Sequence, residues 1–513
     1  MTLRRTHGDT ATATIAHLPA AGVDASASPI ALQLDPERCY RALISRDARF
    51  DGRFFIGVTS TGVYCRPVCP ARTPKRVNVR FFACAAAAEA AGFRPCLRCR
   101  PEASPGTPAW LGTSTTVSRA LRYIAEGALD EGSVDELASR LGIGERHLRR
   151  LFIKHLGAAP LAVAQTQRVH FAKRLISETS LPMTQIAMDA GFSSVRRFNA
   201  AVQKAYRRNP TTLRRTKTRE RVDEERGDLT LRLAFRPPLP WDLMMDFLRL
   251  RAIPGVEHVG RDLYRRSVVV DDTPGIIEVH RPNGAPYLQL RVPIRLSGGL
   301  ATIVASTRRL FDLGADPRQI GAQLARDRVL ARRVRRTPGL RVPGAWEGFE
   351  IAVRAIVGQQ VTVKGATTIM GRLVEGHGTL LPASARNGVT RLFPTAERLA
   401  QARLGRLGMP GARAETIRTL ARAVVSGDLR LDASEGLDTT VATLSALPGI
   451  GPWTAHYIAM RVFGEPDAFP EGDLGLRRAL VRGRVASTRE LSTRAEAWRP
   501  WRAYAAMYLW SIP

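Results

Sequence analysis

The sequence predicts a multidomain protein that is mainly α-helical and has α+β parts. Its 513 residues suit about three or four domains, each able to bury its own core. Two segments interrupt the globular pattern: PEASPGTPAWLGTSTT is rich in Pro, Gly, Ser and Thr, and RRTKTRERVDEERGD is highly charged. Strand-like runs such as LTLRLAF, YRRSVVVD and YLQLRVPI gather just after the charged segment, whereas helical periodicity dominates elsewhere. A small cysteine-bearing domain, a helical domain, a small α/β domain and a second helical domain are therefore expected.

The expected boundaries follow the same shifts in composition. They are a disordered N-terminus over 1–33, a cysteine-bearing domain over 34–103, a linker over 104–116, a helical domain over 117–215, a charged linker over 216–228, an α/β domain over 229–300, and a helical domain over 301–513.

The charge balance favours a polyanionic partner. The chain has 77 basic and 46 acidic residues, and a formal net charge of +31. Only six of the basic residues are lysines, so the arginine excess can also reflect genome composition. No run of roughly 18 apolar residues exists that could span a membrane. The six cysteines are confined to one segment, which favours a reducing cytoplasm and a local thiol site over a disulfide framework.

Four cysteines have the spacing of a zinc site. Cys65 and Cys69 form one close pair, and Cys96 and Cys99 form a second pair 26 residues later. Two such pairs can supply four thiolates to one tetrahedral Zn²⁺. On spacing alone, a purely structural zinc module is the alternative. Cys39 and Cys84 lie outside the pairs and are expected to be core or surface thiols.

The first helical domain contains two similar helix-turn-helix patterns. SVDELASRLGIGERHLRRLFIKHLG turns at Gly142, and MTQIAMDAGFSSVRRFNAAVQKAYRRNP repeats the plan later. Arginine and asparagine are the residue types that read guanine and adenine in the major groove. The alternative is a helical spacer with a solvated charged face. The residues expected to contact DNA are Arg146, Arg149, Arg150, Arg196, Arg197 and Asn199.

The segment LPGIGPWTAHYIAMRVFGEPDAFPEGD predicts a helix, a tight turn, a second helix and then an acidic residue, Asp473. Gly449 and Gly451 allow backbone conformations and close approaches that a Cβ would block. A glycine-rich turn before a helix N-terminus also exposes N–H groups that suit a phosphate. Trp453 and Tyr457 share a helix face. The alternatives are an ordinary αα-hairpin or the hairpin of a non-enzymatic DNA-binding protein, and Asp473 can also serve as a helix N-cap.

Two resemblances cover the first half of the chain. DGRFFIGVTSTGVYCRPVCPAR followed by AAGFRPCLRCRPE resembles the N-terminal domain of the Ada adaptive-response protein. That resemblance implies that Cys65 is both a zinc ligand and the irreversible acceptor of a methyl group from a DNA methylphosphotriester. Arg66, Arg72 and Arg94 flank the site and are expected to hold the DNA backbone. The tandem helix-turn-helix block, with its GF-S-S---F and NP signatures, resembles the AraC-family DNA-binding domain, which implies promoter DNA and RNA polymerase as partners.

A third resemblance covers the second half. Leu229 to Pro513 resembles the alkylbase DNA glycosylase AlkA, and the hairpin resembles that of the helix-hairpin-helix glycosylase superfamily. The resemblance implies a TBP-like α/β domain, a helical glycosylase domain, and excision of alkylated bases of the 3-methyladenine and 7-methylguanine class from double-stranded DNA. It also implies a monovalent cation at the hairpin. The residue roles that it implies are Asp473 as catalytic carboxylate, Trp453, Tyr457 and Trp510 around the flipped base, and Gln360 as the wedge, borne on the helix that contains GFEIAVRAIVGQQ.

Three absences narrow the chemistry. Trp453 stands where strand-cleaving members of the superfamily carry a nucleophilic lysine, so Schiff-base lyase activity is not expected. The second half has no cysteine, which excludes an iron–sulfur cluster there. The chain also lacks a PCHR-like active site for repair of O6-methylguanine.

These resemblances together imply a cytoplasmic bacterial fusion, monomeric, in which methyl uptake promotes transcription of repair genes while a glycosylase excises alkylated bases. One alternative is a damage-responsive regulator whose C-terminal half only binds DNA. A second is a glycosylase whose N-terminal half is a DNA tether with purely structural zinc.

Overall fold

The computed structural model describes residues 35–105, 115–130, 132–215, 228–382, 388–431, 436–481 and 483–511. The expected disordered N-terminus, 1–33, and most of the expected linkers, 104–116 and 216–228, lie outside the described residues.

The cysteine-bearing module is built on a four-stranded sheet in the order β3-β1-β2-β4. Strand β1 is antiparallel to β2 and β3, and β2 is parallel to β4. Phe54 and Ile56 are fully buried beneath the sheet. The elements are α1 (Pro36–Ile44), β1 (Phe55–Val58), β2 (Val63–Cys65), β3 (Val79–Phe82), α2 (Ala85–Ala90) and β4 (Arg94–Pro95). Because β2 ends at Cys65 and the parallel strand β4 runs into Cys96, the pairing brings the two cysteine pairs together.

The two expected helix-turn-helix units are present. In each, a glycine with positive φ makes the turn: Gly142 at 68° and Gly191 at 78°. Leu137 and Leu148 are fully buried in the first unit. The helices are α3 (Thr115–Ala125), α4 (Val134–Arg140), α5 (Glu145–Leu156), α6 (Pro160–Glu178), α7 (Met183–Asp189), α8 (Val195–Tyr206) and α9 (Pro210–Arg215). The long helix α6 joins the two units.

The strand-like runs form a five-stranded antiparallel sheet in the order β5-β9-β8-β7-β6. Alternate residues of β5 and β9 are buried, which gives the sheet one apolar face. Helix α11 packs in the same hydrophobic cluster as that face. The elements are β5 (Asp228–Ala234), α10 (Trp241–Arg251), β6 (Glu257–Val259), β7 (Leu263–Val270), β8 (Thr273–His280), β9 (Tyr287–Pro293) and α11 (Leu300–Leu310).

The rest of the described chain is helical, as its periodicity predicted. The helices are α12 (Pro317–Leu324), α13 (Arg328–Arg336), α14 (Gly348–Val357), α15 (Val363–His377), α16 (Ala396–Ala400), α17 (Gly411–Ser426), α18 (Leu437–Ser445), α19 (Pro452–Arg461), α20 (Leu474–Leu480), α21 (Thr488–Ala495) and α22 (Arg502–Trp510). Helices α18 and α19 form the expected hairpin. One expectation is wrong in detail: Gln360 lies in the turn between α14 and α15, because α14 already ends at Val357.

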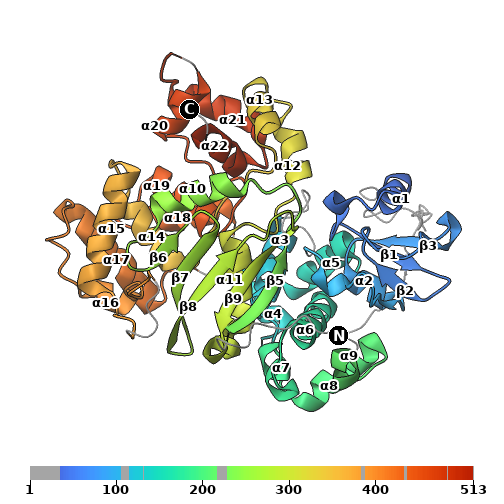
Figure 1. The fold of residues 1–513 in the computed structure, drawn as a ribbon. Coiled ribbons are helices and arrows are strands. Elements are labelled where there is room, and N and C mark those ends of the chain that lie inside the picture. Colours follow the sequence, from blue (N-terminus) through green and yellow to red (C-terminus); the bar gives the residue numbers. More distant parts are fainter. Residues whose placement is uncertain are drawn as a thin grey trace, which may run out of the picture.

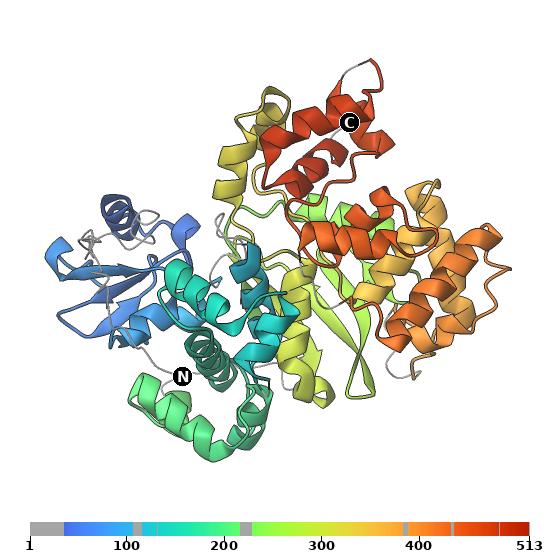
Figure 2. The ribbon, with the colours of Figure 1, turned by 180° about the vertical axis from the view of Figure 1, so that it is seen from behind.

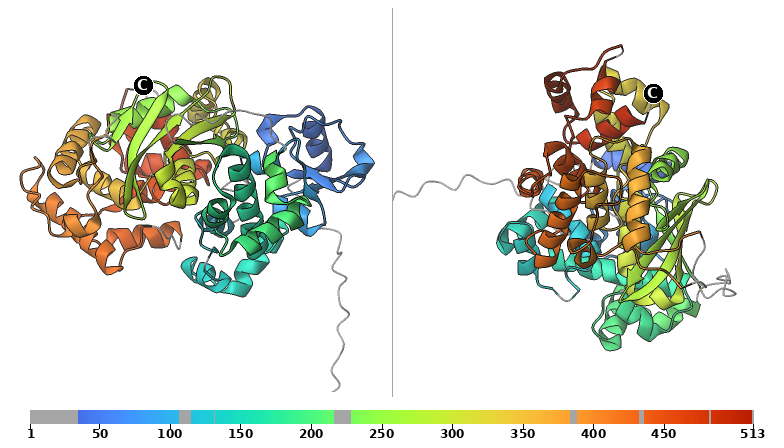
Figure 3. Two further views of the ribbon diagram at one scale, coloured as in Figure 1. Left: turned by 60° about the horizontal axis from the view of Figure 1, so that its bottom comes forward. Right: turned by 90° about the vertical axis from the view of Figure 1, so that its left-hand side faces the viewer.

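Helices α3 to α6 (teal) lie between the cysteine-bearing module (blue) and the five-stranded sheet (yellow-green) in views from both sides, and α7 to α9 (green) lie below them (Figures 1 and 2). Helices α14 to α17 and the cysteine-bearing module stand at opposite ends of the molecule (Figure 3, left). Within the described residues, no helix has both the length and the apolar character that a membrane span requires.

Candidate metal centre and active site

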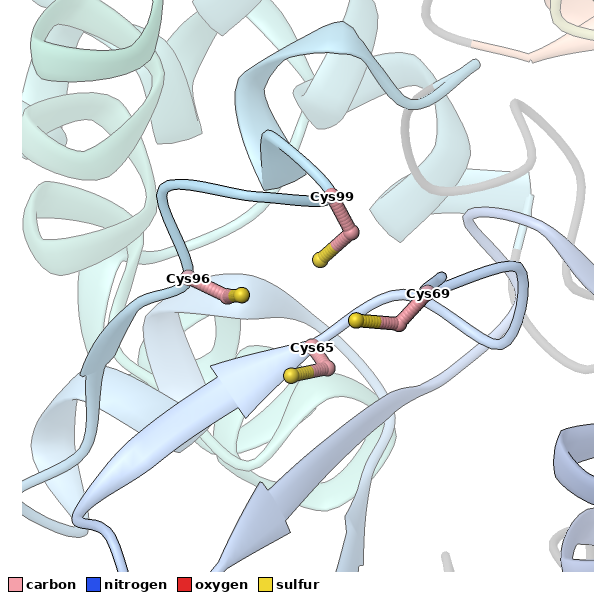
Figure 4. A group of neighbouring side chains, drawn as sticks. All are labelled: Cys65, Cys69, Cys96 and Cys99. Carbon is pink, nitrogen blue, oxygen red and sulfur yellow. The ribbon is translucent and has the colours of Figure 1, made fainter. Parts of the chain in front are cut away.

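The four paired cysteines converge on one point. Their Sγ atoms all lie within 4.8 Å of one another and all four residues are buried. Figure 4 shows the four side chains directed toward a common centre from β2, from the loop after it, and from the segment after β4. Cys39 and Cys84 remain outside the cluster as buried thiols, and burial raises the pKa of Cys84 to about 11.

The donor set fits a thiophilic divalent cation. Hydrogen bonding, first of all with Cys65, lowers the pKa of Cys69 to about 7, whereas the pKa of Cys65 is raised by its hydrogen bonds to Cys69, Cys96 and Cys99. Such crowded thiols share protons, since four bare thiolates at this spacing would repel one another. A Zn²⁺ ion would replace those protons, and Cys65, Cys69, Cys96 and Cys99 would hold it as a four-cysteine site.

Arg66 makes hydrogen bonds that hold the chain around this site in place. Its backbone N–H lies 3.4 Å from Cys99 Sγ, and its Nη1 donates to the Cys99 carbonyl at 3.1 Å. Its Nε donates to Asp51 Oδ1 at 2.9 Å, and Asp51 is buried. Arg72 and Arg94 are exposed beside the site. Sequence reasoning missed Asp51, which no spacing rule connects with Arg66. All three arginines stay predictions as DNA contacts, and the guanidinium of Arg66 already has protein partners.

The residues expected to read DNA lie on the second helix of each unit and are exposed. They are Arg146, Arg149 and Arg150 on α5, and Arg196, Arg197 and Asn199 on α8. Arg149 pairs with Glu145, one turn earlier on the same exposed face. Base contacts by these side chains remain predictions.

Three aromatic side chains come together near the hairpin. Trp453 and Tyr457 on α19 stack with ring centroids 5.5 Å apart and planes 13° apart. Trp510, at the end of α22, lies 6.4 Å from Tyr457 with its ring tilted by 57°. All three residues are only partly buried, so part of their surface remains accessible to solvent. Phe247 of α10 packs in the same apolar cluster as Tyr457 and Trp510; sequence reasoning did not single it out.

Asp473 is fixed between the two tryptophans. Trp453 Nε1 donates to Asp473 Oδ2 at 3.0 Å, and Trp510 Nε1 donates to Oδ1 at 3.0 Å. Oδ1 also accepts the Leu476 N–H at 2.9 Å, so Asp473 is the N-cap of α20 as well. The capping role is therefore present, and it holds the carboxylate in one orientation beside the aromatic rings.

Three arginine side chains influence the hydroxyl group of Tyr457. Arg461 Nη1 donates to the Tyr457 hydroxyl at 2.8 Å. Burial alone raises the pKa of Tyr457, but Arg461, Arg251 and Arg354 outweigh it and leave that pKa below its ordinary value. The i, i+4 spacing of Tyr457 and Arg461 was readable in the sequence. Arg251 and Arg354 come from α10 and α14, and no local pattern could have placed them here.

Two turns are exposed: the hairpin turn between α18 and α19, and the turn between α14 and α15 that contains Gln360, here called the wedge turn. Gly449 has φ 85°, and a Cβ there would clash with Thr416 Oγ1, so only glycine fits. Gly451 N-caps α19 and has open space around its Cα. Gln360 is exposed and has φ 56°, a left-handed conformation that is uncommon for a residue with a Cβ.

Comparison with known families matches four segments of the chain. Residues 38–102 match the metal binding domain of Ada, 137–216 a helix-turn-helix domain, 230–347 the AlkA N-terminal domain, and 353–503 the HhH-GPD superfamily of base excision DNA repair proteins.

Three named relatives span different parts of the chain. The "Probable bifunctional transcriptional activator/DNA repair enzyme AlkA" of Mycobacterium tuberculosis is 45% identical over 482 residues, which is 93% of this chain and 96% of that protein. The "DNA-3-methyladenine glycosylase 2" of Escherichia coli is 34% identical over 281 residues, 54% of this chain and 95% of that protein. The "Bifunctional transcriptional activator/DNA repair enzyme Ada" of Escherichia coli is 35% identical over 159 residues, 31% of this chain and 43% of that protein. On the strength of the first match, which runs nearly from end to end, the chain belongs to the family of bifunctional transcriptional activators and DNA repair enzymes of the AlkA type.

Proposed function

We propose that this protein excises alkylated bases of the 3-methyladenine and 7-methylguanine class as a monofunctional DNA glycosylase, and that it also accepts methyl groups from DNA methylphosphotriesters on Cys65 to activate repair genes. The observation that carries the glycosylase half is the carboxylate of Asp473, held by two indole N–H groups beside the stacked ring of Tyr457.

The pocket favours a flipped, electron-poor base. An N-alkylated purine carries positive charge, which the faces of Trp453, Tyr457 and Trp510 attract by about 1–2 kcal/mol once water is excluded. A normal purine gains less, and a damaged base is easier to extract from the stack. Gln360 then fills the space that the flipped base leaves. The turn at Gly449 and Gly451 holds the neighbouring phosphate, with a monovalent cation at the same hairpin.

Asp473 then assists bond cleavage. The C1′–N glycosidic bond breaks, and its electron pair leaves with the base, which becomes neutral as it departs. The sugar develops positive charge at C1′, which the Asp473 carboxylate stabilises. Water adds to C1′ and loses a proton, leaving an abasic site. Trp453 occupies the position at which strand-cleaving members of the superfamily carry their nucleophilic lysine, so no Schiff base is part of this proposal.

Cys65 is the proposed methyl acceptor. Bound zinc keeps the thiols deprotonated at neutral pH. The Cys65 sulfur attacks the methyl carbon, the carbon–oxygen bond breaks, and the electron pair stays on the phosphate oxygen. The triester becomes an ordinary diester, and Cys65 becomes a thioether. One negative charge is lost from the protein, which favours DNA binding and promoter activation through the exposed residues of α5 and α8. RNA polymerase as a partner, a monomeric state and a cytoplasmic location are parts of the same proposal.

The glycosylase is tested by release of free base from methylated duplex DNA. Asp473→Asn keeps the helix cap but removes the charge, and we expect base release to fall by about 100- to 1000-fold. Glu471→Gln is the matched control, because Glu471 is an exposed carboxylate nearby that hydrogen-bonds Ser492. No release by the wild type would leave a C-terminal half that only binds DNA.

Methyl acceptance is tested separately with DNA that carries labelled methylphosphotriesters. We expect one methyl group per chain, located on the peptide that contains Cys65, and none in Cys65→Ala. Cys39→Ala, outside the cluster, should transfer normally. Methyl uptake that persists in Cys65→Ala would reject this acceptor and leave the zinc as a structural ion.

A further inference from the structure

Gln359 connects the wedge turn with the DNA-binding hairpin. Its Nε2 donates to the Gly449 carbonyl at 2.8 Å and to Thr454 Oγ1 at 3.0 Å. We infer that Gln359 is a positioning residue that fixes the wedge turn against the hairpin, and that extrusion of the target base depends on it. The inference rests on the proposed glycosylase function and assigns a separate step to a separate residue.

Thr362 holds the far end of the wedge turn as the N-cap of α15, and Gln359 holds the near end. Residues 360–364 are exposed, and Val361 and Val363 keep 38% and 40% of their surface. Backbone hydrogen bonds to the end of α14 stop at Gln359, whose N–H bonds the Ile356 carbonyl at 3.2 Å. The left-handed conformation of Gln360 is uncommon for a residue with a Cβ and persists only where the surroundings impose it. Gln359, the residue before Gln360, is restrained from the hairpin side by its two hydrogen bonds.

The hairpin offers a fixed anchor. Gly449 is packed so tightly against Thr416 that no Cβ fits, and Thr416 itself donates to the Ala412 carbonyl at 3.1 Å. Thr454 is 2% exposed on α19, directly after Trp453. A single amide group therefore ties the wedge turn both to the turn that faces the phosphate and to the helix that carries the base pocket. Both N–H donors of the amide are used in doing so.

This geometry has a mechanical consequence. A side chain that fills the gap in a base stack is pushed back by the stack. A wedge that can retreat would let the base return before it reaches the pocket. The hydrogen bonds of Gln359 oppose this movement, because they join the wedge turn to the hairpin and to α19. The distance between Gln360 and the base pocket therefore stays the same while the base is out of the helix.

The test uses side-chain shape and substrate pairing together. Gln359→Met keeps the size of the side chain and removes both donors, in a turn where Gly449 is exposed to water. In single-turnover base release from a paired duplex, we expect Gln359→Met to lose about 10- to 30-fold, as the loss of two ordinary hydrogen bonds implies. With the same lesion in an unpaired bulge, where little work is needed to extract the base, the loss should shrink to about twofold or less.

Two further measurements separate positioning from a general structural effect. Gln360→Ala should show the same duplex-specific loss, and Gln359→Met/Gln360→Ala should be no worse than Gln360→Ala alone, because Gln359 acts through the wedge. In the Asp473→Asn background, 2-aminopurine fluorescence beside the lesion reports extrusion without base release, and Gln359→Met should lower that signal.

Several outcomes would overturn the inference. Equal losses on paired and bulged substrates would mark Gln359 as merely structural, and so would additive effects of the two substitutions. Full activity of Gln359→Met on duplex DNA would leave it without a role. These outcomes differ from failure of the proposed function, in which the wild type itself releases no base from either substrate.

Discussion

At the scale of single residues, the structure separates two roles of the tryptophans around Asp473. In the proposed function each ring offers a face to a flipped base, and in the structure each indole N–H binds a different oxygen of the same carboxylate. The second role could not be inferred from the sequence, because Trp510 is distant from Asp473 along the chain. A carboxylate that is held by two donors keeps one orientation, and it is not free to turn toward solvent.

Trp510→Phe should therefore affect chemistry more than binding. Phenylalanine keeps an aromatic face but cannot donate to Asp473 Oδ1. A hydrogen bond to a charged group contributes about 1.5–3 kcal/mol, so we expect kcat to fall by roughly 10- to 100-fold with KM changed little. Trp510→Ala removes the ring as well and should raise KM in addition. Steady-state base release measures both quantities, and a Trp510→Phe variant with wild-type kcat would show that the indole N–H does not matter.

At the scale of elements, helix α7 carries a buried carboxylate whose ionisation lowers the stability of the folded protein. Asp189 is 5% exposed, Gln185 Nε2 donates to its Oδ1 at 2.6 Å, and its Oδ2 has no hydrogen-bond partner among the described residues. Burial raises the pKa of Asp189 to about 6, only partly offset by the bond from Gln185. Because the folded form then binds a proton more tightly than the unfolded form, stability falls as pH rises from about 4 to about 6.

Asp189→Asn should stabilise the second helix-turn-helix unit at neutral pH. The amide keeps an acceptor for Gln185 and cannot ionise, so the gain at pH 7.5 has an upper limit of about 3 kcal/mol, from about two pKa units. At pH 4 the aspartate is protonated in the folded state, and the two proteins should unfold alike. Urea unfolding at both pH values measures the difference. A gain that is equal at the two pH values would exclude ionisation of Asp189 as its cause.

The sequence predicts local elements better than it predicts contacts between segments that lie far apart along the chain. The hairpin and both helix-turn-helix units were predicted, because glycine turns and apolar spacing are local signals. The zinc cluster was predicted too, since each half of it is a close pair of cysteines. The resemblance implies that the wedge residue lies on a helix, but that helix ends earlier, and helix ends are poorly marked by periodicity alone. Asp51 and Arg354 lie far along the chain from their partners, and the fold alone brings them together.

At the scale of the whole molecule, the activator half is docked on the edge of the five-stranded sheet. Strand β5 is an edge strand, and α6 supplies partners for one of its residues: Arg174 Nη2 donates to the Arg232 carbonyl at 2.7 Å, and the Arg232 N–H donates to Glu178 Oε2 at 3.2 Å. Glu178 also pairs with Arg100, the residue after Cys99, at 3.2 Å. One apolar cluster includes side chains from α6 to α9 and from the sheet. Such cover protects a free strand edge and joins three modules at Glu178.

Glu178→Ala should loosen this junction without unfolding any module. Arg232 pairs across from Gln289, and its N–H points outward to α6, so its protection depends on Glu178. We expect hydrogen exchange at the Arg232 amide to accelerate about fivefold or more, as loss of a hydrogen bond to a charged group implies. The amides of Leu231 and Leu233 face β9 in the same strand and should keep their rates, which makes them internal controls. Glu145→Ala removes an ion pair on the distant surface of α5 and should change none of these rates. An Arg232 amide that exchanges equally fast in wild type and Glu178→Ala would mean that the halves do not stay docked in solution, because an edge amide that α6 no longer covers is open to water in both proteins.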